Sequence, residues 1–509
     1  MPDLGNMQLE KLTPAMRQYV EMKQQNPDCI LLFRIGDFYE VFFEDAKICA
    51  NILDLVITSK NKNSDNPIPM AGIPHHSVDK YIPRLISKGY KVAIAEQTTD
   101  PIPGKIVERS IKSIITPGTY IQEQQRELAI LLAISRDVSK GNELYHIAWG
   151  DFSLGAYSTK SFDDLGKLQK YILTLRPTEI ILDTDIPHKD QFISPIQQYL
   201  QCLVSVYALP THPDEVLKNI CKVQQLSSFG KAMTEGRESA LALLFAYIQH
   251  TQQQALTNIT KIKYHSEEGL VLMDEVTIKN LELFSSSYEQ NTKYSLFGIL
   301  DTTKTAGGSR YLRSLLATPI NDKTRLDRRL AAIEHFLHNE DTPRIHQFLT
   351  TFFDIPKLVS LILYRKLSYI PFVKLRSILR ACLEGLDGVM LRELQHFGIN
   401  DVQISALQAL FEQLEKLIKA DEELLGDEDY IRDGADSEID QLRAMAYHSD
   451  DLLLHYQQEL AQASGITNIK LKFVMNQGYF LELTSKDSEL FEQFLDSLTP
   501  LADEKKEKF

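Results

Sequence analysis

Two residues of very different chemistry share one face of a predicted strand near the start of the chain. The stretch GDFYEVF, residues 36–42, follows the apolar run ILLFRI and is typical of a short strand. Because side chains alternate along a strand, Phe38 and Glu40 are expected to point one way, and Tyr39 and Val41 the other. An aromatic ring beside a carboxylate does not suit a hydrophobic core, since burying an unpaired charge is expensive. The pair is therefore the first candidate for a functional site.

A plainer interpretation of the same stretch competes with this one. Gly36 and Asp37 are typical turn residues. After such a turn, Phe38 would be a core aromatic and Glu40 a solvated residue of an edge strand. The residue types alone do not choose between the two interpretations.

Metal and disulfide chemistry find little support in the residue spacing. His75 and His76 have no cysteine or carboxylate at metal-ligand spacing, so they are predicted to be structural or surface residues, and no metal site or catalytic residue is predicted. The cysteines are scattered, odd in number and never in a C-x-x-C pair, which predicts buried thiols in a reducing cytosol. They are Cys29, Cys49, Cys202, Cys221 and Cys382. Neither a signal peptide nor a membrane span is expected.

The elements that position the candidate pair belong to one of several domains, because 509 residues exceed a single hydrophobic core. Residues 14–26 have helical spacing. Short apolar runs then alternate with turns and helices as far as residue 120, which predicts a mixed α/β domain. Residues 127–262 begin again with strands, two of them joined by a tight turn near residues 151–155, and predict a three-layer α/β domain.

The rest of the chain is predicted to be mainly helical. After Met273 the strand signal nearly disappears and long amphipathic segments follow. The segment from Ile439 to Ser464 is expected to run as one extended helix, and IKLKFVMNQGYFLELTS then returns to strands around an Asn-Gln-Gly turn. The predicted fold class is therefore multidomain α/β plus α.

Charge is distributed unevenly along the chain. The formal net charge of -14 excludes a histone-like binder of polyanions. Residues 1–120, however, carry acids and bases in about equal number, and the excess acid lies elsewhere, notably in ADEELLGDEDYIRDGADSEID. A local nucleic-acid footprint in the N-terminal domain is therefore compatible with the composition.

The order of motifs along the chain resembles that of a known family. Four motifs together resemble the mismatch-recognition domain of the bacterial MutS family of DNA repair proteins. They are LFRIGDFYEVFFEDA, PIPMAGIPHHSVDKYIPRLI, VAIAEQ and SIITPGT. Two further stretches, MDEVTIKNLEL and LDTTKTAGGSRYLRSLLATPI, resemble the family's lever region. The stretch IRDGADSEIDQLR resembles the start of its long helices, and IKLKFVMNQGYFLELT resembles the start of its DNA clamp. The resemblance is collinear over nearly the whole chain.

The resemblance implies four domains. They are a mixed α/β mismatch-recognition domain at residues 1–120, a ribonuclease-H-like α/β connector at 127–262, a long-helix lever or core domain at 263–438, and the start of an incomplete β clamp at 439–509.

The resemblance also implies roles for the candidate pair. Phe38 would be a wedge inserted from the minor groove, and Glu40 would accept a hydrogen bond from, or share a proton with, the displaced base. A mispair has already lost pairing and stacking energy, so the same kink is cheaper there, and selectivity follows from deformability. Lys60 and Lys62 are expected to contact the DNA backbone, and Met70 to lie against the minor groove. Alternatively, Lys62 is a solvated residue and Met70 a core residue.

Residues 1–509 contain no G-x-x-x-x-G-K-[ST] loop, and KTAGGSRY is interpreted as a turn between helices. The chain is therefore expected to be no enzyme and to carry no cofactor of its own. The resemblance implies that a complete family member is an ATP hydrolase that uses ATP and Mg²⁺ in a domain after the clamp. A truncation, a split gene and an incomplete record would give the same sequence.

Partners and location follow from the resemblance alone. The expected ligand is double-stranded DNA with mismatches or small loops, and a complete protein is expected to be a homodimer that works with a MutL-type protein, in the cytoplasm at the nucleoid and without a membrane. Two alternatives are kept. One is a Mg²⁺-dependent ribonuclease-H-like nuclease that uses Asp151 and Asp183, and the other is a repair scaffold that does not bind DNA.

Overall fold

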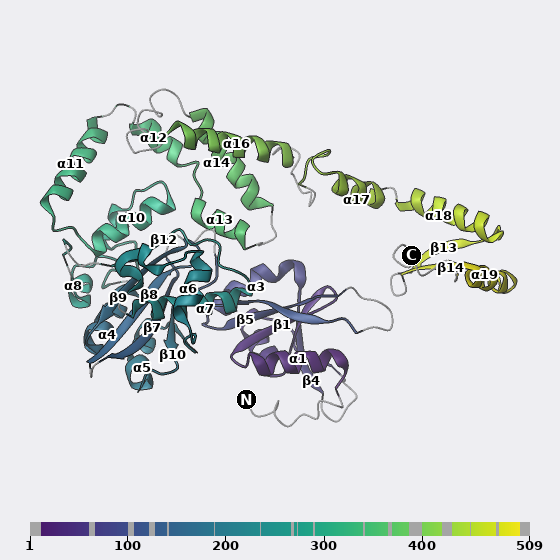
Figure 1. The fold of residues 1–509 in the computed structure, drawn as a ribbon, viewed down its shortest axis with the longest axis horizontal. Coiled ribbons are helices and arrows are strands. Elements are labelled where there is room, and N and C mark those ends of the chain that lie inside the picture. The colour runs from purple at the N-terminus through teal and green to yellow at the C-terminus, as the bar shows by residue number, and fades with distance from the viewer. Residues whose placement is uncertain are drawn as a thin grey trace. The chain divides into compact units, whose positions relative to one another are not determined.

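The computed structural model divides the chain into two units, Met1–Asn400 and Asp401–Phe509. Figure 1 shows the order of helices and strands. The described residues are 12–60, 67–99, 106–121, 128–139, 142–187, 189–234, 236–265, 269–271, 273–288, 291–338, 340, 342–364, 369–385, 400–419, 430–447, 449–474 and 478–498.

The first sheet of unit 1 has the strand order β3-β4-β2-β1-β5-β6. The β1-β5 pair is parallel, and the other four neighbouring pairs are antiparallel. Strand β2 lies between β4 and β1, so the alternative that placed Glu40 on an edge strand is wrong. The strands are β1 (Cys29–Ile35), β2 (Phe38–Phe42), β3 (Thr58–Lys60), β4 (Ile68–Pro74), β5 (Lys91–Gln97) and β6 (Arg109–Ile115).

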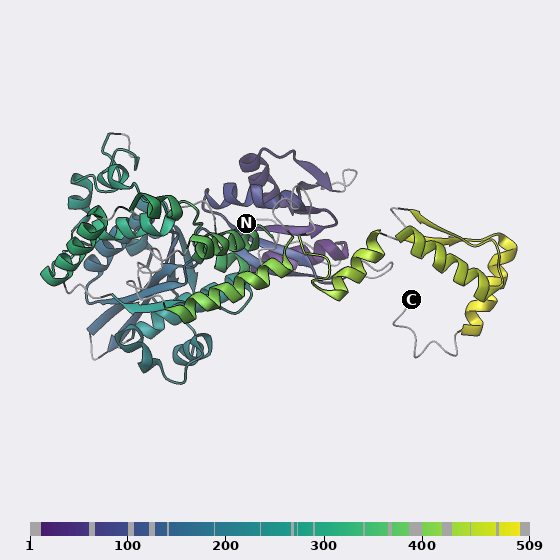
Figure 2. The ribbon, with the colours of Figure 1, turned by 90° about the horizontal axis from the view of Figure 1, so that it is seen from above.

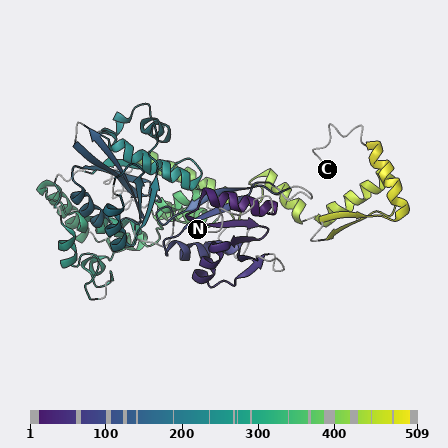
Figure 3. The same ribbon diagram turned by 90° about the horizontal axis from the view of Figure 1, so that it is seen from below.

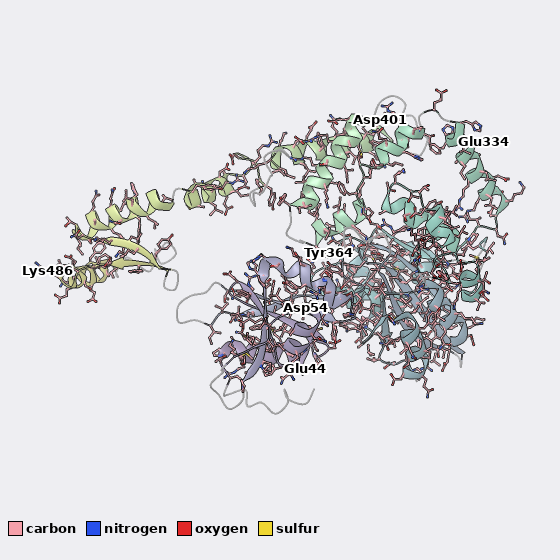
Figure 4. All side chains as sticks on the ribbon, turned by 180° about the vertical axis from the view of Figure 1, so that it is seen from behind. Glu44, Asp54, Glu334, Tyr364, Asp401 and Lys486 are labelled. Atoms are coloured by element: carbon pink, nitrogen blue, oxygen red, sulfur yellow. The ribbon has the colours of Figure 1, made fainter. Side chains whose placement is uncertain are left out.

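Helices cover both faces of this sheet, and the alternation of side chains along the strands divides its core in two. On one face Tyr19 packs with Leu31 and Phe33, and on the other face Leu32 packs with residues of two helices. Figure 3 shows the first helix, in dark purple, along one face of its sheet, and Glu44 and Asp54 in Figure 4 mark the two ends of the second. The helices are α1 (Pro14–Gln25) on the first face, and α2 (Phe43–Leu53) and α3 (Val78–Ile86) on the second.

A buried ion pair joins α1 to the sheet and to α2. Lys23 Nζ lies 2.9 Å from Asp45 Oδ1, and the two side chains are 5% and 6% exposed. Lys23 also donates to the carbonyl of Cys29, and the second Asp45 oxygen accepts a hydrogen bond of 3.0 Å from the backbone N–H of Leu31. Several hydrogen bonds therefore compensate both charges, and removal of one partner would leave the other buried and uncompensated.

The second sheet has the order β11-β10-β7-β8-β9-β12 and lies between two layers of helices, as the sequence predicts. Gly155, with φ of +63°, closes the predicted tight turn, and a Cβ there would lie 1.6 Å from the carbonyl oxygen of Asn258. The elements are β7 (Ile130–Ser139), β8 (Asn142–Asp151), β9 (Ala156–Phe162), β10 (Glu179–Asp183), β11 (Leu203–Tyr207) and β12 (Lys261–Tyr264), with α6 (Pro213–Cys221) and α7 (Arg237–Gln252) on one face and α4 (Leu165–Leu175) and α5 (Lys189–Leu200) on the other.

Helix α7 contacts the first sheet as well as the second (Figure 1). Lys91 of β5 pairs with Asp28 at 2.6 Å, and its ammonium lies 5.9 Å from the centre of the Tyr247 ring on α7. The fully buried Glu179 accepts hydrogen bonds from the hydroxyl of Tyr247 and, at 3.1 Å, from the backbone N–H of Gly118. A buried carboxylate of the second sheet therefore binds the segment that leaves the first.

The described residues from 275 to 385 form helices and no named strand, as predicted. Ser360 donates a hydrogen bond of 2.7 Å to the carbonyl of Ser153, and the hydroxyl of Tyr364 donates one of 2.7 Å to Asn258. Figure 4 labels Tyr364, and Figure 2 shows the green helices beside the second sheet. The helices are α8 (Glu275–Asn280), α9 (Leu296–Leu300), α10 (Ala306–Ala317), α11 (Lys323–His338), α12 (Thr342–Leu349), α13 (Ile355–Leu363) and α14 (Ile370–Gly385).

The KTAGGSRY stretch is not a turn, and that prediction is wrong. Gly307 and Gly308 lie in the first turn of α10, whose N-cap is Thr305. The Thr305 hydroxyl accepts a hydrogen bond of 3.0 Å from the backbone N–H of Gly308. A capping threonine therefore offsets the low helix propensity of two glycines at a helix start.

The segment of unit 2 expected to form one extended helix is helical on both sides of His448, which lies outside the described residues. The predicted return to strands is confirmed, because β13 and β14 pair antiparallel on either side of residues 475–477. Among the described residues of the chain, no helix is both long and apolar enough to cross a bilayer. The elements are α16 (Asp401–Leu417), α17 (Ser437–Tyr447), α18 (Ser449–Ser464), β13 (Lys470–Val474), β14 (Gly478–Glu482) and α19 (Ser485–Leu498).

We expect Lys23→Met to destabilise the first sheet by about 3 kcal/mol, because Asp45 then stays buried without its counter-charge. Hydrogen exchange of the β1 and β2 amides, read by mass spectrometry, measures this free energy of opening. Lys47→Met is the control, since Lys47 and Glu44 form an exposed pair worth less than about 1 kcal/mol. Equal exchange in the two variants would contradict the role given to the buried pair.

All five cysteines are free thiols, and burial raises the pKa of Cys29 and of Cys49 to about 12. The thiolate is the reactive form, so a raised pKa leaves almost none of it at pH 8. We expect iodoacetamide at pH 8 to leave Cys29 and Cys49 unmodified in the folded protein and to modify both in urea. Peptide mass spectrometry measures this, and equal modification in the two conditions would show that these thiols are accessible.

Candidate functional site

The candidate pair is placed by a tight hairpin between β1 and β2. Ile35 and Phe38 are cross-strand partners, so only Gly36 and Asp37 form the loop. Gly36 has φ of +57°, a conformation that glycine adopts without strain and that two-residue hairpin loops require. The backbone N–H of His75 donates a hydrogen bond of 2.9 Å to the carbonyl of Asp37. The loop is thereby tied to the 3-10 turn His75–Ser77 that directly follows β4.

Phe38 is an exposed aromatic on an ordered strand. Its side chain is 47% exposed, whereas Tyr39 is 5% exposed and Val41 is fully buried. The predicted division of faces is therefore confirmed, and the alternative that made Phe38 a core aromatic is wrong. In the neighbouring strand β4, Gly72 lies close to the ring, and a Cβ there would be 3.5 Å from Phe38 Cδ1.

Glu40 lies on the same face as Phe38 but is largely covered. Its side chain is 20% exposed, and Oε2 is buried with no hydrogen-bond partner among the described residues. Lys60 Nζ lies 3.7 Å from that oxygen, close enough for an ion pair but too far for a hydrogen bond. The Lys60 ammonium also lies 5.1 Å from the centre of the Phe42 ring. Glu40 therefore keeps an unused acceptor close to a cation.

Arg109 belongs to the site, although the sequence did not single it out. Its guanidinium lies 5.0 Å from the centre of the Phe33 ring, and Phe33 is the cross-strand partner of Glu40. Arg109 Nε donates a hydrogen bond of 2.6 Å to the carbonyl of Arg34. Burial lowers the pKa of Arg109, and the charge of Glu40 opposes that shift. The alternation in RSIKSII hinted at the strand, but the pairing of β5 with β6, which contains an irregularity in register, decides where Arg109 points.

The other predicted contact residues are only partly gathered by the fold. Lys60 ends β3 next to Glu40, as described. Met70 is half-buried and packs against the core under α1, so much of its side chain belongs to that core. Lys62 lies outside the described residues. The roles of Lys60, Lys62 and Met70 at DNA stay predictions.

The two carboxylates considered for binding Mg²⁺, those of Asp151 and Asp183, do not lie close together. Asp151 is the cross-strand partner of Ile130 at the start of β7, whereas Asp183 follows Leu182, the partner of Ile134. The two carboxylates are thus about 15 Å apart along the strands, far more than a shared Mg²⁺ allows. Asp151 is buried, and accepts hydrogen bonds of 2.9 Å from Ala129 and 2.8 Å from Ser153. Within the described part of the chain, no three His, Cys, Asp or Glu side chains form a metal cluster.

The fold and the site define a multidomain α/β protein that presents an exposed aromatic ring and a carboxylate on one face of a strand. Three family models match the chain in order, MutS domain I at residues 13–124, MutS domain II at 129–260 and MutS domain III at 276–505. Together they cover nearly the whole sequence.

Curated proteins are similar over the same range. The DNA mismatch repair protein MutS of Caldicellulosiruptor bescii is 31% identical, over 95% of this chain and 55% of its own length. The protein of the same name from Streptococcus gordonii and the DNA mismatch repair protein HexA of Streptococcus pneumoniae are each 32% identical, over 94% of this chain and 55% of their own lengths. This chain spans about half the length of these relatives. It belongs to the MutS family.

We expect Phe38→Ala to change the stability of the first sheet by less than about 1 kcal/mol, because the ring is half exposed. Tyr39→Ala, one residue further, should cost about 3 kcal/mol, because Tyr39 is buried in the core. Hydrogen exchange of the β1 amides compares the two variants. A large loss of stability in Phe38→Ala would mean that the ring is structural.

Proposed function

We propose that this chain recognises mispaired bases and small loops in duplex DNA by inserting Phe38 from the minor groove. The observation that carries the proposal is the exposed Phe38 ring on the same strand face as Glu40, whose Oε2 has no hydrogen-bond partner among the described residues. Membership of the MutS family supports it, since relatives carry the name DNA mismatch repair protein.

The wedge selects by the energy of deformation. Separating two stacked base pairs with an apolar side chain costs a few kcal/mol on paired DNA. At a mispair part of that energy is already lost, so the kink forms more easily. A wedge must itself be rigid, and Phe38 is held by pairing of its strand with β1 and β4. The backbone that holds the ring therefore loses little conformational entropy when the ring enters the stack.

Glu40 adds the second part of the selection. Its unused oxygen can accept a hydrogen bond from a displaced base, which stacked and paired bases do not offer. On ordinary duplex the carboxylate only meets phosphates, and that repulsion lowers the affinity. Lys60 and Arg109 reduce the repulsion by placing positive charge beside the carboxylate. We propose that Lys60 turns from Glu40 to a phosphate in the complex, and that Lys62 and Met70 contact the backbone and minor groove.

The larger parts of the protein are assigned by family. We propose residues 1–120 as the mismatch-recognition domain, 127–262 as a connector, 263–438 as the lever and 439–509 as part of the clamp. The order β9-β8-β7-β10-β11, with β7, β10 and β11 parallel, supports a ribonuclease-H-like connector. Its two candidate carboxylates are too far apart to share Mg²⁺, so no observation favours nuclease activity.

Partners and cofactors complete the proposal. We propose that hydrolysis of ATP with Mg²⁺ belongs to an ATPase domain that the sequence of residues 1–509 does not contain, and that this part of the protein is no enzyme. A protein with that domain would act as a homodimer with a MutL-type partner, in the cytoplasm at the nucleoid.

We expect Phe38→Ala to abolish the preference for a mismatched duplex, with a loss of about tenfold or more in affinity for a G·T or one-base-bulge duplex and little change for the matched duplex. Fluorescence anisotropy at one fixed salt concentration measures both affinities. Tyr199→Ala is the control, because Tyr199 is also an exposed aromatic, 53% exposed, on α5. Equal affinity of the unmodified chain for both duplexes would reject the proposal.

We expect Glu40→Gln to increase affinity for the matched duplex by about fivefold, because the amide keeps an acceptor but removes the charge that phosphates repel. The ratio of mismatched to matched affinity should therefore fall towards one. The same anisotropy assay at two salt concentrations measures this, and the increase should shrink at high salt. Unchanged binding of matched DNA would remove Glu40 from the selection step.

A further inference from the structure

The face of the first sheet opposite Phe38 carries a polar contact directly behind the exposed ring. Tyr39 follows Phe38 in β2, is 5% exposed, and packs in the core on the side of α2 and α3. The Tyr39 hydroxyl donates a hydrogen bond to Glu96 Oε1 of β5, 57 positions further along the chain. The backbone that presents Phe38 on one face is therefore anchored by a polar contact on the other.

This hydrogen bond spans three neighbouring strands. Strand β1 lies between β2 and β5 in the sheet, and Arg34 of β1 is the cross-strand partner of Tyr39. The residues that precede Arg34 and Glu96 pair with each other in the parallel strands β1 and β5, so these two side chains follow on the same face. The Tyr39 side chain therefore reaches across β1 to a carboxylate on the strand beyond it.

Arg34 connects this contact to the hairpin loop. Its guanidinium carbon lies 5.6 Å from the centre of the Tyr39 ring, which is a cation–π distance. Its Nε donates a hydrogen bond to the carbonyl of Gly36, in the two-residue loop before Phe38. The carbonyl of Arg34 accepts a hydrogen bond of 2.6 Å from Arg109 Nε of β6. The loop, the Tyr39 ring and β6 are thus linked at Arg34.

The protonation state of Tyr39 suits a hydrogen-bond donor. Burial raises the pKa of Tyr39, the hydrogen bond to Glu96 and its charge raise the pKa further, and Arg34 opposes the shift. The phenol therefore keeps its proton at and above neutral pH. A hydrogen bond from a phenol to a carboxylate is stronger than one between two neutral groups, so the contact is suited to hold the strand in place.

We propose that Tyr39, Glu96 and Arg34 position the Phe38 wedge, and we call their contacts the Tyr39 brace. The inference rests on the insertion of Phe38 proposed above and names what holds that ring. Phe38 is the first residue of β2, and strand ends are the parts of a sheet that open most easily. A ring that separates stacked base pairs works only if its strand resists the force of the stack. The Tyr39 brace supplies that resistance from the opposite face, without contacting DNA.

The Tyr39 brace should matter only in the complex in which the ring is inserted. A matched duplex resists the kink, so its binding depends on phosphate contacts and not on the wedge. Loss of the brace should therefore weaken the binding of a mispair or bulge and leave the binding of the matched duplex unchanged. A group that only stabilised the fold would lower both affinities together.

The first experiment is Tyr39→Phe, which removes the hydroxyl and leaves the ring in the core. We expect about a fivefold loss of affinity for a one-base-bulge duplex and little change for the matched duplex, measured by fluorescence anisotropy at one fixed salt concentration. A 2-aminopurine base beside the bulge reports unstacking directly. Its fluorescence increase at saturating protein should be smaller with Tyr39→Phe than with the unmodified chain.

Tyr145→Phe is the matched control. The Tyr145 hydroxyl donates a hydrogen bond of 2.8 Å to Glu143 in the second sheet, so the same phenol-to-carboxylate contact is removed away from Phe38. Both affinities should stay as in the unmodified chain. A second variant pair tests the acceptor. Glu96→Gln should bind the bulge more tightly than Glu96→Ala, because the amide oxygen still accepts the phenol proton.

A double-mutant cycle separates positioning from stability. In the Phe38→Ala background, Tyr39→Phe should cause no further loss of bulge affinity, because the hydroxyl acts through the ring. A further loss in that background, or an equal loss for both duplexes in Tyr39→Phe alone, would overturn the positioning role. If Phe38→Ala abolishes the preference for the bulge while Tyr39→Phe keeps it, this inference fails and the proposed function stands. If the unmodified chain shows no preference, both fail.

Discussion

The alternation of side chains along β2 is the constraint on which the candidate site depends. Tyr39 and Val41 are buried between the sheet and the helices α2 and α3, and that burial fixes the face of every other residue of the strand. Phe38 and Glu40 are therefore held on the opposite face without any interaction that selects them directly. A shift of register by one residue would bury Phe38 and Glu40 and expose Tyr39 and Val41. The stability of the core therefore also maintains the candidate site.

The face of β2 that carries Phe38, Glu40 and Phe42 is only partly covered by α1. The degree of cover separates the structural residue Phe42 from the candidate site residues Phe38 and Glu40. Helix α1 covers Phe42, whose ring packs 4.9 Å from that of Tyr19, but Phe38 at the start of the strand is exposed. The buried Lys23–Asp45 pair joins α1 to α2. Glu40 lies between these extremes, because its side chain is 20% exposed and close enough to Lys60 for charge compensation, while its buried Oε2 has no hydrogen-bond partner among the described residues.

Positive charge in this acidic chain lies against aromatic rings beside both sheets of unit 1. Near Glu40 it is supplied by Lys60 and Arg109, and beside the second sheet by Lys160 and Arg313. In both places the cations lie against aromatic rings, which lets a charge be held at low exposure. A net charge therefore says little about ligands until the cations are located.

The sequence by itself determined the division of faces in GDFYEVF, the helical character after Met273 and the strand pair around residues 475–477, because these features depend on local periodicity and turn chemistry. Its ordered motifs also indicated the family. The tertiary structure decided that β2 is an interior strand, that KTAGGSRY starts a helix, and that Arg109 lies over the ring of Phe33, the cross-strand partner of Glu40, which no local pattern shows. Only the tertiary structure shows a cavity lined by Trp149 of β8 and Arg313 of α10. These residues are far apart in the sequence, so their proximity depends on how separate elements pack.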